Sequence, residues 1–418
     1  MNHQDLRINE DRLMQRIEDL ATIGALGETG SCRLALTDED RDGRDLVVTW
    51  MRDLGLEVTI DGIGNVTATR PGQNPGPATM TGSHIDTVAT GGRYDGNLGV
   101  LAGLEVLETL SENNVETQHA MGVAFFTDEE GARFAPDMLG SLVYVGGMPL
   151  EQALDIEGID GTIVGEELDR IGYRGPGPCP GTPPRAFVEL HIEQGPLLEV
   201  ENTTIGAVTG VQGISWTEYT ITGQSNHAGT TPMHLRHDAG YVAAKIAVTA
   251  RELADRMGGR QVSTVGRINL HPDLVNVVAG QATLTVDLRN NDEALLKSAE
   301  AEIAACVEQL EQSEGVTITS RTLARFEPVV FDPQVVATVE TTAQRLGHSA
   351  TTMPSGAGHD AQMMARVCPT GMVFVPSKDG ISHNPAEHTD QQDLAAGADV
   401  LLQTMLALDA TDFNGDTA

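Results

Sequence analysis

The sequence has few cysteines, few lysines and few aromatic residues, and it contains no long apolar run. Because a helix needs about 20 predominantly apolar residues to cross a bilayer, no transmembrane helix is expected. The charged N-terminus (MNHQDLRINEDRLMQRIEDL) has a helical pattern and lacks the apolar centre of a signal peptide, so we expect a cytoplasmic protein. The four cysteines form no CxxC pair, which argues against a disulfide scaffold or a structural zinc site.

The scarcity of lysine accompanies a large excess of acidic residues. Asp and Glu number 60 against 26 Lys and Arg, which gives a formal net charge of −34. Such a surface repels nucleic-acid phosphates and anionic lipids, so neither is an expected partner. Acidic excess with little lysine resembles proteins of salt-loving microbes, in which salt screens the self-repulsion. We therefore expect a halophilic protein, with an ordinary acidic bacterial protein as the alternative.

The alternation of short apolar runs with longer segments of helical period predicts an α/β fold. At 418 residues the chain is too long for one ordinary core, so two domains are expected. The Pro/Gly-rich residues 174–184 are predicted to form a loop. Strands are predicted over 55–70, 78–87, 119–130 and 185–195. Helices are predicted over 8–23, 38–54, 98–112, 238–257, 292–312, 333–346 and 390–408.

A middle stretch of the chain has a different character. Strands around 207–224, a helix, strands around 262–289, and then a further helix and strand indicate a self-contained α+β unit. Residue patterns that carry chemistry occur on both sides of it. We therefore predict a first domain formed by residues 1–209 and 326–418, with a second domain of residues 210–325 inserted into it.

Histidines and carboxylates recur directly after the predicted strands. In open α/β sheets the loops after the strands meet at the carboxyl edge, so these side chains are expected to converge. Two divalent ions about 3.5–4 Å apart need a carboxylate that bridges them, with imidazoles or carboxylates to complete each shell. The motifs are GSHIDT (82–87), GGRYDG (91–96), TDEEG (127–131), ELHIEQG (189–195) and DGISHN (379–384).

This chemistry gives each of five residues a role in binding two divalent ions. Asp95 is the predicted bridge, with His84 and His191 on one ion and Glu130 and His383 on the other. Zinc, manganese, cobalt and nickel all accept such a mixed set of ligands, so the sequence does not select the metal.

Two further carboxylates accompany these ligands. Asp86 lies two residues beyond His84 and is expected to accept the second ring N–H of that histidine, which would fix its tautomer. Glu129 adjoins a proposed ligand and remains available as a general base. Taken alone, a histidine at a strand end is more often structural, and paired glutamates are usually solvated; the ordered combination carries the prediction.

The series GSHIDT, GGRYDG, EEGARF, ELHIEQGP and SHNPAEHT resembles the carbamoylase, allantoate amidohydrolase and β-ureidopropionase group of two-metal amidohydrolases. These enzymes belong to the clan of di-zinc aminopeptidase-like proteins, and the resemblance runs from about residue 8 to residue 408. It implies the five metal roles and the base role given above. It also implies a catalytic domain with a mixed sheet flanked by helices, and an inserted α+β lid domain through which a homodimer forms.

The resemblance extends to residues of the inserted domain. GQSNHAGTTP (223–232) resembles the segment whose histidine, here His227, stabilises the tetrahedral oxyanion, commonly in the partner subunit's active site. Asn276 and Arg289 resemble the clamp for a substrate carboxylate, a task that suits the planar fork of arginine. The alternatives are a turn histidine bonded to its own loop and a surface charge at a strand end.

Three positions outside the inserted domain resemble further substrate contacts. Gln194 and His359 match positions near the carbamoyl group, although amides and imidazoles are also common supports behind metal ligands. The turn at 356–358, which includes Gly358, offers backbone N–H groups to a substrate anion.

The function implied by the resemblance is metal-dependent hydrolysis of the carbamoyl C–N bond of an N-carbamoyl-L-amino acid, giving the amino acid, carbon dioxide and ammonia. Allantoate, ureidoglycolate and N-carbamoyl-β-alanine remain alternative substrates. The motifs HIEQGP and NHAGTTP favour these amidohydrolases over a dipeptidase or an aminoacylase. A catalytically silent ligand-binding relative would be expected only if a metal ligand or the base were missing.

Overall fold

The computed structural model describes residues 3–413, and the chain divides into two compact units. Of the described residues, the first unit comprises 3–210 and 330–413, and the second comprises 211–329. The breaks therefore follow Gly210 and Val329, where the sequence predicts breaks after 209 and 325. Each unit is described by itself.

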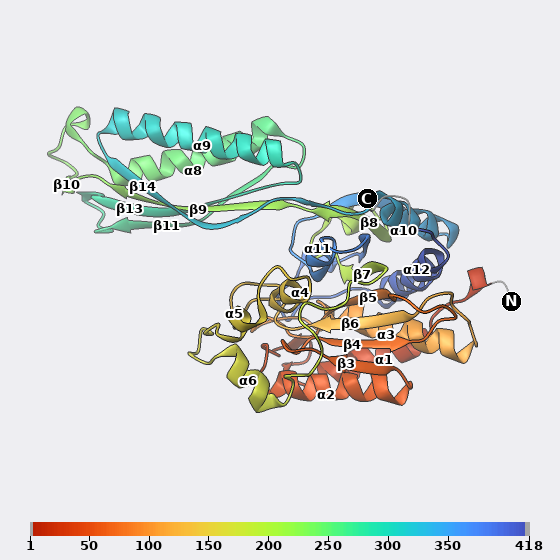
Figure 1. The fold of residues 1–418 in the computed structure, drawn as a ribbon. Helices are drawn as coiled ribbons and strands as arrows, with labels where there is room; N and C mark the ends of the chain where they lie inside the picture. The colour runs from red at the N-terminus through yellow and green to blue at the C-terminus, as the bar shows by residue number, and fades with distance from the viewer. Residues whose placement is uncertain (1–2, 414–418) are drawn as a thin grey trace. The chain divides into compact units, whose positions relative to one another are not determined.

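The first unit is built on a nine-stranded mixed sheet (Figure 1). Its order is β15-β8-β17-β7-β5-β6-β4-β3, with β16 beside β8. The central strands β17, β7, β5 and β6 run parallel, so their carboxyl ends share one edge. The strands are β3 (Glu57–Ile60), β4 (Val66–Arg70), β5 (Thr79–His84), β6 (Met121–Phe126), β7 (Ala186–Ile192), β8 (Ile205–Val211), β15 (Val329–Val330), β16 (Ala350–Ser355) and β17 (Thr370–Val375).

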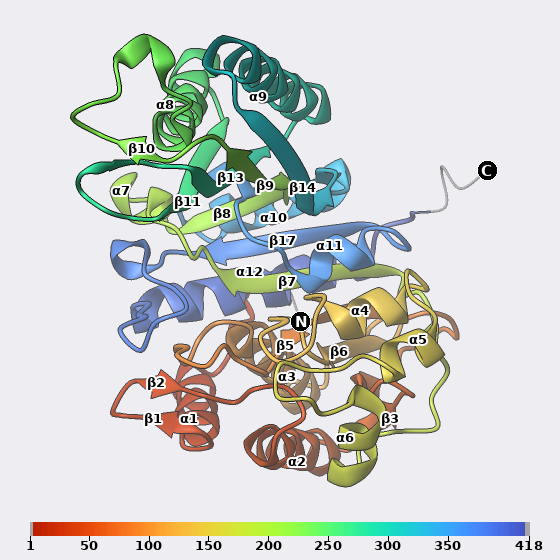
Figure 2. The ribbon, with the colours of Figure 1, turned by 90° about the vertical axis from the view of Figure 1, so that its left-hand side faces the viewer.

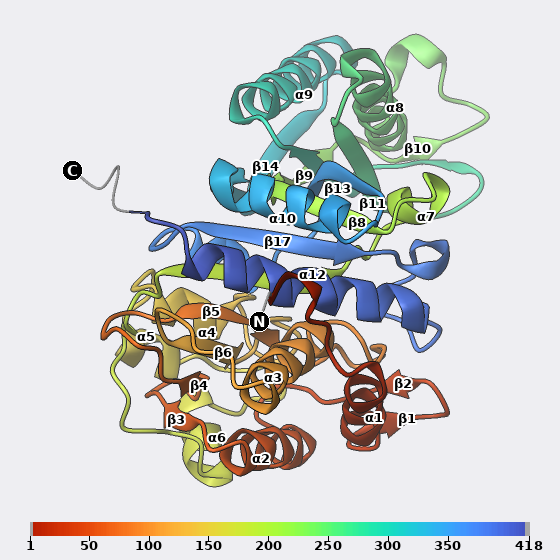
Figure 3. The same ribbon diagram turned by 90° about the vertical axis from the view of Figure 1, so that its right-hand side faces the viewer.

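Helices cover both faces of this sheet. Figure 3 shows α3, α10 and α12 on one side, and Figure 2 shows α4 and α11 on the opposite side. The longer helices are α1 (Glu10–Ala21), α2 (Asp38–Asp53), α3 (Asn97–Glu112), α10 (Pro333–Arg345) and α12 (Gln391–Asp409). The shorter ones are α4 (Leu139–Tyr144), α5 (Leu150–Leu154), α6 (Val164–Ile171), α7 (Leu197–Val200) and α11 (Asp360–Met364). The predicted α/β fold with a mixed sheet flanked by helices is confirmed.

The sequence explains why the core forms where it does. Every residue of β5, β6, β7 and β17 is buried, as expected for parallel strands covered on both faces. The outer helix α1 buries Leu13, Ile17 and Leu20 at helical spacing. Thr37 caps α2 by accepting the backbone N–H of Asp40. The rigid central strands therefore present their carboxyl ends at fixed positions.

The second unit is an antiparallel four-stranded sheet of order β11-β13-β9-β14, with two helices on one face (Figure 1). Side chains of β13 alternate, and Ala282, Leu284, Val286 and Leu288 pack in the core beneath the helices. The elements are β9 (Gly213–Thr222), β10 (Asn226–His227), α8 (Ala239–Met257), β11 (Val262–His271), β12 (Val277–Val278), β13 (Gln281–Asn290), α9 (Glu293–Glu314) and β14 (Thr317–Phe326).

Among residues 3–413, no helix combines the length and apolar character that crossing a bilayer would require. The short two-residue strands β1 (Ala25–Leu26) and β2 (Gly30–Ser31) pair with each other. Single turns of 3-10 helix occur at η1 (His3–Asp5), η2 (Met233–Leu235) and η3 (Lys378–Gly380).

The net charge of −34 predicts that salt stabilises the protein. We expect the melting temperature to rise by several degrees Celsius between about 0.01 and 1 M KCl, because the screening length falls from about 30 Å to about 3 Å. Differential scanning calorimetry over a KCl series measures this shift, with sucrose as the uncharged control. A high melting temperature that stays constant in dilute buffer would contradict the expectation.

Candidate metal centre and active site

Five candidate metal ligands come together at the carboxyl edge of the parallel strands. His84 is the last residue of β5, and His191 lies near the end of β7. Glu130 follows β6, His383 lies in the loop after β17, and Asp95 lies between β5 and α3. Residues far apart in the chain therefore meet because parallel strands end at the same edge.

The ligand atoms form two groups that share Asp95. Within each group, His84–Asp95–His191 and Asp95–Glu130–His383, all ligand atoms lie within 4.8 Å of one another. Asp95 Oδ1 lies 3.1 Å from His191 Nε2 and 3.6 Å from His84 Nε2. The other oxygen, Oδ2, lies 3.5 Å from His383 Nε2, which is 3.2 Å from Glu130 Oε2. Donor atoms about 2.0–2.2 Å from a tetrahedral ion lie roughly 3.4 Å apart, so this set fits divalent cations on either side of Asp95.

Backbone carbonyls fix the orientation of the two buried imidazoles. His84 Nδ1 lies 2.9 Å from the carbonyl oxygen of Asp86, and His191 Nδ1 lies 2.8 Å from that of Ile192. Since a carbonyl only accepts, Nδ1 of each ring donates, and each Nε2 faces the Asp95 carboxylate. The backbone N–H of Gly96 also lies 3.1 Å from His191 Nε2.

The predicted contact of the Asp86 side chain with His84 is wrong. The Asp86 carboxylate lies 4.0 Å from Nδ1, because the carbonyl of the same residue already occupies that side of the ring. The carboxylate instead accepts the backbone N–H groups of Glu129 and Glu130, both at 3.3 Å. Asp86 therefore supports the loop that carries these two glutamates.

The buried charges of the cluster perturb one another. Burial raises the pKa of Glu129 well above its ordinary value. Burial also acts on Asp95, but hydrogen bonds from His191 and His84 outweigh it and hold the pKa of Asp95 well below its usual range. A site with three carboxylates in this space has a local negative charge that divalent cations would neutralise.

Metal binding at the Asp95–Glu130–His383 group is expected to strengthen with pH. The hydrogen bond to Glu130 raises the pKa of His383 to about 9, so at pH 7 the metal-free ring is protonated and must lose its proton to bind a cation. The apparent affinity should rise up to about tenfold per pH unit below pH 9 and then level off. Calorimetric titration with Mn²⁺ at pH 7, in buffers of different ionisation enthalpy, counts the released protons. The variant His383→Ala should release about one proton fewer, and buffer-independent heats in the wild type would contradict the expectation.

A cavity of about 110 Å³ brings the predicted base and several predicted substrate contacts to the same place as the ligands. Glu129 faces it beside the metal ligands, with its carboxylate 3.4 Å from His84. Asp137 also lines the cavity and was not predicted. The lining residues are His84, Asp95, Glu129, Glu130, Asp137, His191, Gln194, Ala357, Gly358, His359 and His383.

Gln194 and His359 take up different positions in this wall. Gln194 donates from Nε2 to Asp95 Oδ2 at 2.8 Å, while its buried Oε1 has no hydrogen-bond partner among residues 3–413. His359 bonds through Nε2 to Ser355 Oγ at 2.9 Å, and its ring lies 4.6 Å from that of His191. Burial lowers the pKa of His359 well below its ordinary value, so its ring is neutral.

The other predicted substrate contacts belong to the second unit. His227 lies on β10, which pairs with β12, and the carbonyl of Asn276 accepts the N–H of Ala228 at 2.9 Å. Arg289 lies on β13, where it donates to the Asp287 carboxylate at 3.0–3.2 Å. The structure therefore brings His227 and the Asn276 backbone together.

The imidazole ring of His227 contacts its own loop through Nδ1. Gly229 donates its backbone N–H to His227 Nδ1 at 3.0 Å. Because Nδ1 accepts, the neutral ring carries its proton on Nε2. The loop contact thus makes the ring an N–H donor. It agrees both with the predicted oxyanion role of His227 and with the alternative of a turn histidine bonded to its own loop.

Glu387 is one of the buried carboxylates beside the candidate metal ligands that the prediction missed. Glu387 is 3% exposed and accepts the backbone N–H groups of Tyr94 and Asp95 at 3.1 and 3.2 Å. Burial, reinforced by the charge of Asp95, raises its pKa to about 7. Its only signal in the sequence is a glutamate four residues after His383, within SHNPAEHT.

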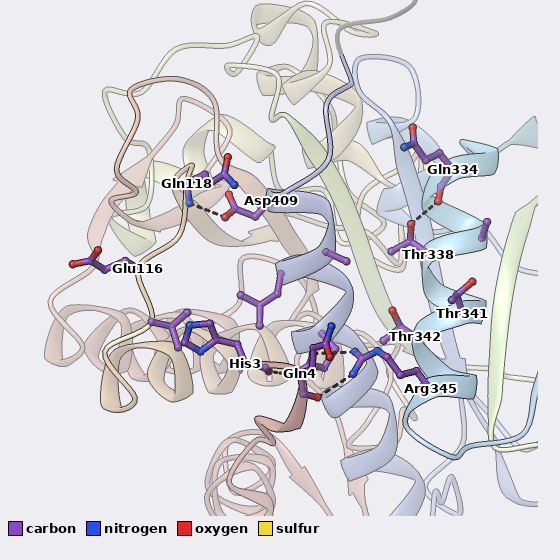
Figure 4. A pocket seen from close by; sticks show the side chains of 15 residues that line it. His3, Gln4, Glu116, Gln118, Gln334, Thr338, Thr341, Thr342, Arg345 and Asp409 are labelled. Carbon is purple, nitrogen blue, oxygen red and sulfur yellow. Dashed lines mark hydrogen bonds between the residues drawn. The ribbon is translucent and has the colours of Figure 1, made fainter. Parts of the chain in front are cut away.

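A larger cavity of about 710 Å³ lies elsewhere in the first unit, along α10 and α12 (Figure 4). Its polar side chains maintain the local fold. Arg345 donates to the carbonyl of Gln4 and to Gln403, and Asp409 accepts the backbone N–H of Gln118. This wall offers no catalytic combination of the kind found at the carboxyl edge.

Comparison with known proteins places this site in a family. A model described as peptidase family M20/M25/M40 matches residues 80–407. The chain is 41% identical to the N-carbamoyl-L-amino-acid amidohydrolase of Rhizobium meliloti over 96% of this chain and 97% of that protein. It is 34% identical to the allantoate amidohydrolase of Bacillus subtilis over 98% and 100% of the two chains. A solved hydantoinase/carbamoylase family amidase from Burkholderia multivorans is 43% identical, covers 97% of this chain and 99% of its own, and superposes with a TM-score of 0.95.

These matches cover almost the whole chain and confirm the resemblance that the motifs predicted. The chain therefore belongs to peptidase family M20/M25/M40, as a hydrolase of linear amides related to the hydantoinase/carbamoylase amidases.

Proposed function

We propose that this protein hydrolyses the carbamoyl C–N bond of N-carbamoyl-L-amino acids, using two divalent metal ions per subunit. The observation that carries the proposal is the placement of Asp95, whose two oxygens face two different sets of ligands while Glu129 lies beside them. The carbamoyl amidohydrolase relative, 41% identical over nearly its full length, supports the same reaction. The expected products are the free amino acid, carbon dioxide and ammonia.

Glu129 is the proton carrier of the proposed reaction. Its carboxylate takes a proton from the water whose oxygen attacks the carbamoyl carbon, and it then delivers that proton to the departing amino nitrogen. The C–N bond breaks to give the amino acid and carbamate, and carbamate decomposes to carbon dioxide and ammonia. Bound divalent ions would supply Lewis-acid polarisation of the carbonyl and lower the pKa of water.

Two groups support recognition of the ureido end of the substrate. Gln194 Oε1 is a buried acceptor without a partner among the described residues, in the wall of the cavity. An unpaired buried acceptor is costly, and the NH₂ group of a carbamoyl substrate would satisfy it. His227, with its proton on Nε2, is the proposed donor to the developing oxyanion.

The carboxylate end of the substrate is assigned to the second unit. Arg289 offers a guanidinium held in orientation by Asp287, and Asn276 adds an amide. A free carboxylate is common to N-carbamoyl amino acids, allantoate and ureidoglycolate, so this clamp does not separate them.

A homodimer through the second unit completes the proposal. Its edge strand β11 exposes Val262, Ile268 and Leu270 at 42–46%, and the neighbouring helix α8 exposes Tyr241 and Val248. An unpaired edge strand with exposed apolar side chains favours pairing with a second copy.

Allantoate is the second candidate substrate, supported by the 34% identity to an allantoate amidohydrolase over 98% of this chain and 100% of that protein. Ammonia release by the metal-loaded protein separates the candidates. The panel contains several N-carbamoyl-L-amino acids, N-carbamoyl-β-alanine, allantoate, ureidoglycolate and a few dipeptides, in low and high salt. Turnover of N-carbamoyl-L-amino acids that chelation abolishes is expected; turnover of allantoate or dipeptides alone would replace the proposal.

A further inference from the structure

Glu387 joins two loops that carry metal ligands. It lies in the loop between η3 and α12, four residues after His383, and is 292 positions from Asp95. Its Oε1 accepts two successive backbone N–H groups, from Tyr94 at 3.1 Å and Asp95 at 3.2 Å. A carboxylate that accepts two neighbouring amides fixes the direction of the backbone between them.

Ser382 extends this contact to the Asp95 side chain. Its hydroxyl donates to Asp95 Oδ2 at 3.0 Å and lies 3.3 Å from Glu387 Oε2. Asp95 is thus held through its backbone by Glu387 and through its carboxylate by Ser382, the residue directly before His383. The same short segment that presents one ligand therefore positions the carboxylate shared by both groups.

The packing around Glu387 leaves little freedom for another arrangement. A β-carbon at Gly92 would overlap the Glu387 carboxyl group, so the glycine of GGRYDG makes room for it. Glu387 is 3% exposed, and solvent does not compete for its hydrogen bonds. Gly92 and Glu387 lie in different sequence motifs. The glycine leaves the space that the Glu387 carboxylate occupies when it accepts the backbone N–H groups of Tyr94 and Asp95.

We propose that Glu387 is a positioning residue that aligns the Asp95 carboxylate between the two candidate metal sites and couples the Asp95 loop to the His383 loop. It touches neither substrate nor reacting atoms. The inference rests on the metal sites of the proposed function and is independent of which substrate is cleaved. Loss of this contact displaces the ligand shared by both ions, so it weakens binding at both sites.

Equilibrium dialysis and calorimetric titration of the full-length protein with Mn²⁺ test this role. We expect Glu387→Ala to lower Mn²⁺ affinity at both sites by about ten- to hundredfold, the usual effect of removing a group that orients metal ligands. Glu387→Gln keeps an oxygen acceptor for the two N–H groups and should stay within about threefold of the wild type. If Glu387→Ala fails to fold, Ser382→Ala takes its place in the test. We expect Ser382→Ala to lower Mn²⁺ affinity several-fold.

Asp409 provides a matched control in the same unit. It is a buried carboxylate that accepts two successive backbone N–H groups, from Gln118 at 2.7 Å (Figure 4) and from His119 at 2.8 Å. It lines the larger cavity, which shares no lining residue with the cavity of the metal ligands. Asp409→Ala should lower the melting temperature about as much as Glu387→Ala does and leave Mn²⁺ binding unchanged. Wild-type Mn²⁺ affinity in Glu387→Ala, or in Ser382→Ala where that variant is needed, would overturn this inference alone. Wild-type protein that binds no Mn²⁺ would overturn the proposed function together with it.

Discussion

Replacing Glu129 by glutamine should lower kcat by about two to four orders of magnitude while metal binding is retained. Glu129 lines the cavity of the ligand cluster, and its backbone is held by the Asp86 carboxylate at 3.3 Å. The glutamine side chain has the same shape and hydrogen-bonding reach but cannot take up the proton of water. Steady-state ammonia release and metal analysis of the same preparation measure both quantities.

The neighbouring glutamate is the natural control for this variant. Glu130 belongs to the ligand group with Asp95 and His383, whereas Glu129 does not. Glu130→Gln should therefore lose affinity for one ion along with its activity, and Glu129→Gln should lose activity alone. Near-normal turnover in Glu129→Gln would remove that residue from the role of base, and loss of metal from it would make it a ligand.

The strands that present the site could be predicted because their environment leaves a clear pattern. β5, β6 and β7 are buried on both faces, so they appear in the sequence as apolar runs that end in polar motifs. The short helices α4 to α7 and α11 could not be predicted, because four to eight residues are too few for a periodic signal and their form depends on tertiary contacts.

Individual atomic contacts within the site could be predicted from the sequence less well than the strands. A spacing of two residues indicated that Asp86 would reach His84, but it did not distinguish the side-chain carboxylate from the backbone carbonyl that makes the bond. The contact of Glu387 with the backbone of Asp95 joins residues 292 positions apart, so no local sequence pattern predicts it. Residue types and their order predict which groups converge, while the three-dimensional path of each loop decides which oxygen serves which partner.

Loss of the His227 imidazole is the second change with a large expected effect. His227→Ala should lower kcat by about two to three orders of magnitude, the scale of a lost oxyanion donor, with Mn²⁺ binding unchanged because all the candidate ligands lie in the first unit. The N–H of Gly229 occupies Nδ1 and leaves the proton of the neutral ring on Nε2, as the proposed donor role requires. Gly229→Ala offers a milder comparison, since it retains that N–H.

In the proposed homodimer, mixed dimers would show in which subunit this histidine acts. If His227 serves the partner's site, a dimer of one Glu129→Gln chain and one His227→Ala chain contains one intact site, formed by the unaltered Glu129 and the unaltered His227. Random mixing makes about half of the dimers mixed, each with one of two sites intact, so activity should return to about a quarter of the wild-type value. Action within its own subunit leaves both sites of the mixed dimer defective, and the mixture would then show no more activity than the two variants measured separately. The two variant chains can also carry different tags, be co-expressed and be purified through both tags. Every dimer that remains is then mixed, so the expected activity rises to about half of the wild-type value.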